Sequence, residues 1–291
     1  MEANQKNTEG LKEHMDSLFI FAATISYRAN HLLPVIQASK SLIGINLDHP
    51  PRILLKWLEQ YVKDFIPNFK PPSPSDQHAS PGTITYAHLE QLIMNKEVSK
   101  SNIYLTHLLQ VADPRHIAEF MLELGAKQSL GSFLFCWSAF RSIQFLGESI
   151  GYPILYHCLS KLLEMEEGGK KNANLPLKKF ELYCHQFQIH ETQMIRKNKI
   201  IPPLDKMILK IERELSNTYS PAIPIILINM IRKEGEQGII SYLSTIKKDR
   251  ISSNLILLLD ALRSALKFSN NPKDLVLCRI FDNCRKNEYV K

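Results

Sequence analysis

The sequence lacks the short motifs that identify the common catalytic folds. It contains no GxGxxG, GxxxxGK[ST], GxSxG or HExxH pattern and no EF-hand loop. Each of these patterns has a known mechanism, such as phosphate binding by a glycine loop or zinc binding by two histidines. Their absence removes the sequence support for a dinucleotide-binding enzyme, a P-loop nucleotide hydrolase, an α/β-hydrolase or a zinc protease.

Cysteine is scarce, with five residues in a chain of 291 and no CxxC pair. An odd number without paired spacing excludes a zinc ribbon and a thioredoxin-type motif. Most of the five lie among apolar residues, which is typical of buried free thiols in a reducing compartment. We therefore expect a cytoplasmic protein.

Long hydrophobic runs are also missing. The stretch 128–147 has a single charge, Arg141, but contains two glutamines and four serines. A membrane-spanning helix needs about 20 predominantly apolar residues, and the apolar run 221–231 is shorter than that. The first eleven residues are polar. We expect neither a transmembrane segment nor a secretory signal.

Charge is unevenly distributed. The chain has 36 Lys and Arg against 29 Asp and Glu, a net charge of +7. Residues 1–160 contain 13 basic and 14 acidic side chains, whereas residues 161–291 contain 23 and 15, a net +8. A basic half predicts an acidic protein partner or a small anionic ligand. Part of the charge is expected at helix C-termini, with Lys247, Lys248 and Arg250 as the example.

Nucleic acid ranks last among the partners. The densest basic patch, 196–199, has few aromatic residues beside it. Single-stranded nucleic acids are bound by stacking bases on aromatic side chains, which this patch does not offer. No zinc-finger or RNA-binding signature is present either.

Nearly every segment has the periodicity of an amphipathic helix, and no run of useful length has the alternation of a strand. We predict an all-α fold without a sheet, a multi-helix bundle or helical-hairpin array of about a dozen helices. The expected helices cover residues 11–33, 34–43, 51–65, 84–97, 100–111, 114–125, 128–147, 153–165, 177–198, 203–217, 222–234, 236–248, 252–268 and 272–287.

Five regions follow from composition. A segment rich in proline and serine at 67–83 and one rich in glycine and lysine at 166–176 are expected to be loops. They separate an N-terminal helical segment, 1–66, from a central apolar helical core, 84–165, and a basic C-terminal helical region, 177–291. A single domain containing all five is the alternative.

One helix start is specific. Asp113 followed by Pro114 predicts a capping carboxylate and a proline at the first helical position. Gly125 is expected to end that helix, since glycine favours the residue after a C-cap.

Two residues are the candidates for catalysis. His107 lies between apolar residues, where an imidazole needs a partner and can serve as acid, base or ligand. Arg141 is the only charge on a helix that is apolar almost all round, so it is expected to meet a carboxylate, a carbonyl or an anion. Tyr104, Cys136 and Trp137 would line the ligand pocket.

Two metal sites are conceivable from spacing. His116, Glu119 and Glu123 lie within about 60° of each other on a helix of about 100° per residue. Glu181 and His185, four residues apart, are the alternative ligand set. An ordinary solvent-exposed polar face explains the first set equally well, and the second set is a single ExxxH unit without the second copy that a carboxylate-bridged di-iron bundle needs.

His157 is expected on the surface. It shares the polar side of its helix with Ser160, Lys161 and Glu164. His185 and His190 are five positions apart, an angle of about 140° on a helix, so these two histidines are not expected to share an ion.

Two functions are therefore carried forward. The leading interpretation is a cytoplasmic all-helical binding protein whose basic C-terminal half contacts an acidic partner. The alternative is an enzyme with a pocket between bundle helices that uses His107 and Arg141 together with a metal or cofactor, and oxidoreductase chemistry fits that alternative. The sequence assigns no particular cofactor and no oligomeric state.

Overall fold

The computed structural model describes residues 2–26, 32–70, 83–128, 130–147, 151–164 and 225–268. Within these ranges every regular element is helical, with eleven α-helices, one 3-10 helix and no strand, which confirms the predicted all-α fold. The elements are α1 (Glu2–Ala23), α2 (Leu32–Ile43), α3 (Arg52–Val62), α4 (Tyr86–Met94), α5 (Val98–Val111), α6 (Pro114–Gln128), α7 (Leu130–Leu146), α8 (Gly151–Leu163), α11 (Ile225–Glu234), α12 (Gln237–Thr245), η4 (Lys248–Arg250) and α13 (Ser253–Phe268).

The helices belong to two compact units. Unit 1 contains α1, α2 as far as Gln37, and α4 to α8. Unit 2 contains the rest of α2, α3 as far as Gln60, and α11 to α13 with η4. The five regions expected from composition stay a prediction.

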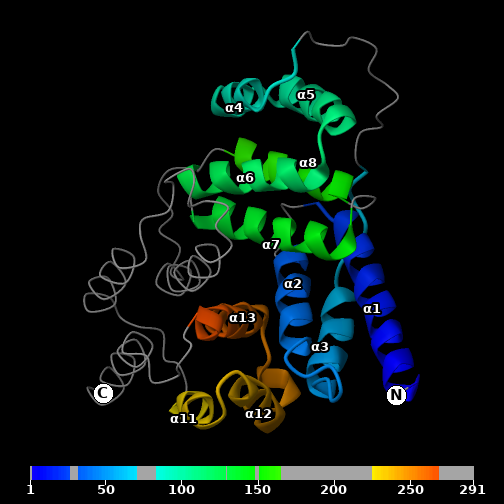
Figure 1. The fold of residues 1–291 in the computed structure, drawn as a ribbon, viewed down its shortest axis with the longest axis vertical. Helices are drawn as coiled ribbons and strands as arrows, with labels where there is room; N and C mark the ends of the chain where they lie inside the picture. Colours follow the sequence, from blue (N-terminus) through cyan, green and yellow to red (C-terminus); the bar gives the residue numbers. More distant parts are fainter. Residues whose placement is uncertain are drawn as a thin grey trace, which may run out of the picture. The chain divides into compact units, whose positions relative to one another are not determined.

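Helix α8 is central in unit 1. It packs against α1, α4, α5, α6 and α7, and Figure 1 shows it beside α6 and α7. Seven of its positions from Ile154 to Leu163 are buried apolar residues. Helix α7, which is apolar almost all round, is also buried along residues 135–143. Residues 154–159 of α8 are all buried, which explains why a polar residue such as His157 is enclosed on that helix.

The start of α6 matches the prediction. Pro114 is its first residue, and the Asp113 carboxylate accepts a hydrogen bond of 2.7 Å from the backbone N–H of Arg115. The boundary predicted between the helices 11–33 and 34–43 lies earlier in the structure, because α1 ends at Ala23 and Pro34 falls within the first turn of α2. Backbone N–H groups in a first turn have no intrahelical acceptor, so proline is tolerated there.

The prediction that Gly125 ends its helix is wrong. Helix α6 continues to Gln128, and Gly125 is buried inside it. A Cβ atom at this position would lie 3.0 Å from the backbone oxygen of Ser132 and 3.2 Å from the Cα of Phe133. Glycine is needed here because α6 and α7 approach each other closely, not because the backbone turns.

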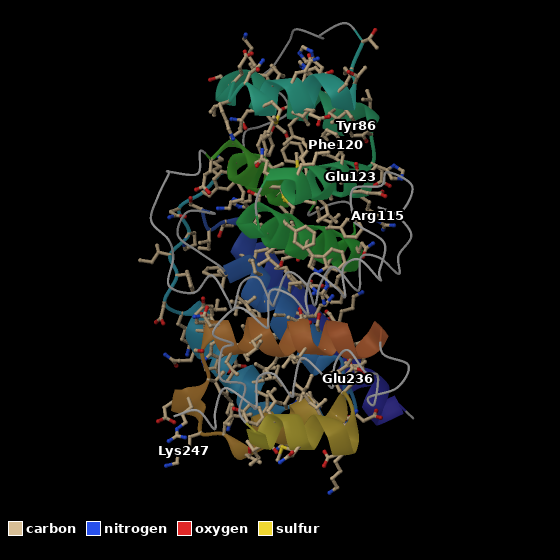
Figure 2. The ribbon with its side chains drawn as sticks, turned by 90° about the vertical axis from the view of Figure 1, so that its left-hand side faces the viewer. Tyr86, Arg115, Phe120, Glu123, Glu236 and Lys247 are labelled. Carbon is tan, nitrogen blue, oxygen red and sulfur yellow. The ribbon has the colours of Figure 1, made fainter. Side chains whose placement is uncertain are left out.

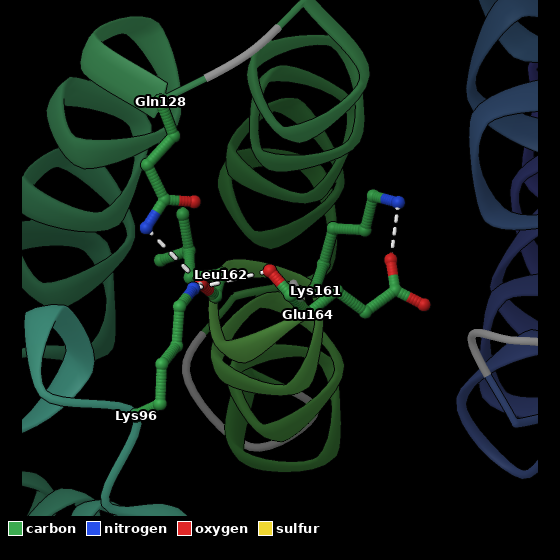
Figure 3. Close-up of polar contacts among 5 residues, drawn as sticks. All are labelled: Lys96, Gln128, Lys161, Leu162 and Glu164. Carbon is green, nitrogen blue, oxygen red and sulfur yellow. Dashed lines mark hydrogen bonds and ion pairs between the residues drawn. The ribbon is translucent and has the colours of Figure 1, made fainter. Parts of the chain in front are cut away.

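The C-terminus of α8 is capped by distant side chains (Figure 3). The ammonium group of Lys96, in the turn between α4 and α5, donates hydrogen bonds to the carbonyl oxygens of Leu162 at 2.9 Å and Glu164 at 3.0 Å. The Gln128 amide donates a third bond, also to Leu162, at 3.0 Å. Lys96 has a φ of 57° and is the only non-glycine residue described with a positive φ. These bonds satisfy carbonyls that have no partner within a helix.

Unit 2 contains a tight helical hairpin and a buried ion pair. Helices α11 and α12 are joined at Gly235, whose φ is +61°, and Gly238 lies against the backbone of Met230. On α13, the Arg263 guanidinium donates a 3.0 Å bond from Nε to the Asp260 carboxylate, and its Nη1 lies 3.5 Å from the Glu236 carboxylate. Arg263 thus joins α13 to the start of α12.

Some expectations concern other parts of the chain. The helices predicted at 177–198, 203–217 and 272–287 lie outside the described residues. None of the helices that the structure does describe has the length and apolar character required to cross a membrane.

Candidate functional site

His107 is the buried histidine of α5. It is 4% exposed, and neither of its ring nitrogens has a hydrogen-bond partner among the described residues. Burial agrees with the apolar position expected from the sequence, but the hydrogen-bond partner expected there is absent. A buried polar group without a partner is destabilising, so such groups are rare in folded proteins.

A chain of hydroxyl groups lies beside His107 in sequence. The Thr106 hydroxyl donates to the backbone oxygen of Asn102 at 3.0 Å and lies 2.5 Å from the hydroxyl of Tyr156 on α8. Tyr152, one turn earlier on α8, reaches the same tyrosine hydroxyl at 3.3 Å. Burial raises the pKa of Tyr156, so its hydroxyl stays protonated near neutral pH. These hydroxyl groups form hydrogen bonds with one another and with the Asn102 carbonyl, and none of them bonds to His107.

The hydroxyl group of Tyr104 holds the start of α4. It accepts a 2.6 Å hydrogen bond from the backbone N–H of Thr85. Thr85 is the N-cap of α4, and its side chain accepts a bond from the N–H of His88. The rings of Tyr104 and His88 lie 4.7 Å apart. Tyr104 therefore has a clear structural role at the α4–α5 contact.

The other predicted site residues lie on α7. Arg141 is buried, 8% exposed, with its guanidinium carbon 5.6 Å from the centre of the Trp137 ring. This distance suits a cation–π interaction. The Cys136 thiol hydrogen-bonds Cys158 on α8, and burial raises the pKa of Cys158 well above its ordinary value. A thiol held in its protonated form is a poor nucleophile.

The structure places these candidates on two helices without joining them. No hydrogen bond, ion pair or ring contact of Tyr104 or His107 involves Cys136, Trp137 or Arg141 in the described part of the chain. The joint use of His107 and Arg141 in one pocket therefore has no direct contact to support it.

The α6 metal candidates lie on a surface that also carries aromatic rings. His116 is exposed, and Glu119 and Glu123 are half-buried. Figure 2 shows Tyr86 and Phe120 packed together at this face, with ring centres 4.9 Å apart. Among the residues described, no three His, Cys, Asp or Glu side chains are grouped closely enough to hold a metal ion. The alternative ligands, Glu181 and His185, lie outside the described residues.

His157 contradicts the expectation of a surface histidine. It is 2% exposed, and its Nε2 lies 2.8 Å from the backbone oxygen of Ala23 on α1. The periodicity of the sequence placed His157 on the polar side of α8, and a helix with one solvent-facing side would expose that side. That side of α8 is covered by α1, whose position cannot be predicted from the periodicity of α8.

Unit 2 exposes a short basic turn, defined as residues 247–250. Helix α12 ends at Thr245, so Lys247, Lys248 and Arg250 do not occupy its last turn as expected. They lie in and before η4, fully on the surface, and none forms an ion pair with another described residue. Figure 2 shows Lys247 at the edge of unit 2. Asp249 is the single acidic residue among them.

Two features therefore remain as functional candidates: the basic turn of unit 2 and the buried, unpartnered imidazole of His107. A scan of protein-family models, a search of curated proteins and a search of solved structures found no match to this chain.

Proposed function

We propose that the chain is an all-helical binding protein whose basic C-terminal region contacts an acidic protein partner. The observation that carries this proposal is the exposed basic turn, in which three of four consecutive residues are cations. Each of these cations is solvated and unpaired among the described residues, so an incoming carboxylate does not have to displace an existing ion pair. Exposed charges of one sign accelerate the encounter with a partner of opposite charge.

An acidic polypeptide fits this surface better than a nucleic acid. The aromatic residue nearest in sequence, Tyr242, is buried, so its ring does not offer a face for stacking on a base. Burial raises the pKa of Tyr242, while the positive charge of Arg250 lowers it. A surface of flexible lysines without exposed rings binds through charge alone, which suits carboxylate side chains.

Reversal of the basic turn tests the proposal. We expect a fluorescent polyglutamate peptide of about 20 residues to bind the full chain at low salt and to dissociate as the salt concentration rises. The triple variant Lys247→Glu, Lys248→Glu, Arg250→Glu is expected to bind at least about tenfold more weakly, because three attractions become repulsions. Fluorescence anisotropy at about 25 mM and about 300 mM NaCl measures both effects.

The control carries the same change in net charge elsewhere. Lys12, Lys100 and Arg115 are exposed on unit 1, and their replacement by glutamate should leave most of the peptide affinity intact. Equal loss in both triple variants would show that only net charge matters and would contradict a site at the basic turn. Tighter binding of duplex DNA than of polyglutamate would favour nucleic acid instead.

A second candidate is an enzyme that uses His107. The observation in its favour is the buried imidazole, neither nitrogen of which has a hydrogen-bond partner in the part of the chain that the structure describes. Proteins retain such destabilising groups where a substrate or ligand supplies the missing partner. A hydrogen-bonded structural histidine would not show this geometry.

The free energy of unfolding of a His107 variant distinguishes a functional role of this histidine from a structural one. Replacement by leucine is expected to raise the free energy of unfolding by about 1 kcal/mol, because an unsatisfied polar group is removed from the interior. The neighbouring change Thr106→Val is expected to lower it by about 1 kcal/mol, since Thr106 bonds both Asn102 and Tyr156. Urea unfolding measures both. A destabilised His107→Leu variant would assign His107 a structural role and would argue against the enzyme.

A further inference from the structure

Residues 66–70 form a strap across the end of α1. The backbone N–H groups of Asn68 and Phe69 both donate to the carbonyl oxygen of Thr24, at 3.0 and 2.9 Å. In return, the N–H of Ser26 donates to the side-chain oxygen of Asn68 at 2.7 Å. The strap thus pairs with the backbone of the chain where it leaves α1, and it makes no regular secondary structure of its own.

The strap lies on His157. The rings of Phe69 and His157 are 4.3 Å apart, and the imidazole is bonded to Ala23, the last residue of α1. A carbonyl oxygen only accepts, so Nε2 of His157 carries the proton and donates it. The neutral ring then has no proton on Nδ1, and Nδ1 is buried without a partner. His157 fits this position only in its neutral form.

We propose that the strap is a pH-operated latch, in which protonation of His157 releases residues 66–70 from the end of α1. A second ring proton would be placed on the buried Nδ1, where no described acceptor is present. The resulting buried cation is unfavourable, and the imidazole has to reach water to be solvated. The Phe69 ring lies against the imidazole, with ring centres 4.3 Å apart, so we expect movement of His157 to be coupled to movement of the strap.

The charges around His157 do not compensate for a cation. The titratable side chains on the three elements that meet at His157 include Glu9, Lys12, Glu13, His14 and Asp16 on α1, Lys70 in the strap, and Tyr152, Tyr156, Cys158, Lys161 and Glu164 on or just after α8. None of them contributes to the lowered pKa of His157, which has two causes: burial lowers it, and the bond to Ala23 partly opposes this. Lys161 and Glu164 are paired with each other at 2.5 Å.

The direction of the effect follows from the lowered pKa. At a pH above the ordinary histidine value, about 6.5, the ring is neutral whether the latch is closed or released. Below that value the released form binds a proton and the closed form does not, so acidification favours release. The closed latch is therefore fully stable at neutral pH and is lost as the pH falls through the lowered pKa.

Hydrogen exchange of the full chain tests the latch. Exchange of the Asn68 and Phe69 amides, corrected for the intrinsic effect of pH, is expected to accelerate about tenfold when the pH falls from about 7.5 to about 5.5. The variant His157→Gln can still donate to Ala23 but cannot ionise, so its strap should exchange equally at both values. His116→Gln, at an exposed position on α6, is the matched control and should behave as the parent chain does.

Several results would overturn the proposal. One is a strap whose corrected exchange does not respond to pH in the parent chain, and another is a response that persists in His157→Gln. If that variant does not fold, an NMR titration of the parent chain decides instead. The His157 signal, identified by its shift in Phe69→Leu, should titrate below about pH 6.5 with the same midpoint as the release of the strap. Two different midpoints would show that His157 does not operate the latch.

Discussion

Replacement of Asp260 by alanine is expected to lower the free energy of unfolding of unit 2 by about 3–5 kcal/mol. Asp260 and Arg263 are 3% and 5% exposed and lie 3.0 Å apart on α13. Removal of the carboxylate leaves a guanidinium charge inside the unit, with Glu236 at 3.5 Å as its remaining acidic neighbour. Breaking one side of a buried pair is much more damaging than removing the pair.

A double variant checks this explanation. Asp260→Leu with Arg263→Met replaces the pair by apolar side chains and should recover most of the lost stability. Lys233→Met, which removes an exposed pair with Glu234, should change it by less than about 0.5 kcal/mol. Urea unfolding in a Trp137→Phe background follows unit 2 alone, because Trp57 is then the single tryptophan. A double variant as unstable as the single one would contradict the role given to the buried charge.

Replacement of Lys96 by methionine is expected to lower the free energy of unfolding of unit 1 by about 2–3 kcal/mol. Methionine retains the length of the aliphatic chain but cannot donate to the carbonyl oxygens of Leu162 and Glu164. Both oxygens belong to the C-terminal end of α8, where a positive charge also interacts favourably with the helix dipole. The exposed neighbour Lys100, 72% exposed and paired with Glu97, is the control, and its replacement by methionine should have little effect.

A glycine variant at position 96 distinguishes the contribution of the lost hydrogen bonds from the contribution of the backbone conformation. Lys96→Gly removes the same ammonium group but fits a φ of 57° without steric strain. Its loss of stability is therefore expected to be about 0.5–1 kcal/mol smaller than that of Lys96→Met. Urea unfolding in a Trp57→Phe background, with Trp137 as the reporter, measures both variants. A glycine variant less stable than the methionine variant would show that the positive φ is not strained.

Local signals in the sequence predicted the helical elements well. Periodicity placed α4 to α8 and α11 to α13 within a few residues of their observed ends, and the Asp113–Pro114 pair placed the start of α6. These features depend on residues that are close in sequence, because capping and helical periodicity act over one or two turns. The predicted boundary between residues 33 and 34 was wrong, because proline is tolerated in the first turn of a helix although it breaks a helix interior.

Features that depend on the packing of distant segments could not be predicted. Gly125 is required by the backbone of α7, Lys96 by the end of α8, and His157 is covered by α1. The partners of these residues are between 7 and 134 positions away, and nothing in the local sequence identifies them. Once the structure is known, each choice of residue has a plain physical reason.

The candidate site was predicted in part. Apolar neighbours in sequence indicated that His107 and Arg141 are buried, and both are. Their separation on α5 and α7 depends on how the helices pack, so it lay beyond a reading of periodicity. The contact between the Trp137 ring and the Arg141 guanidinium could have been predicted, because residues four apart lie on the same face of a helix. The unpartnered nitrogens of His107 gave no signal in the sequence at all.

The capping of α8 has a consequence for the order in which unit 1 is completed during synthesis. Both donors, Lys96 and Gln128, precede the carbonyls of Leu162 and Glu164 in the chain. Both donors leave the ribosome before the end of α8, so they are available to form hydrogen bonds when these carbonyl groups emerge. Growth of the chain from its N-terminus thus suits this arrangement, because the last turn of α8 need not wait for any later residue to terminate it.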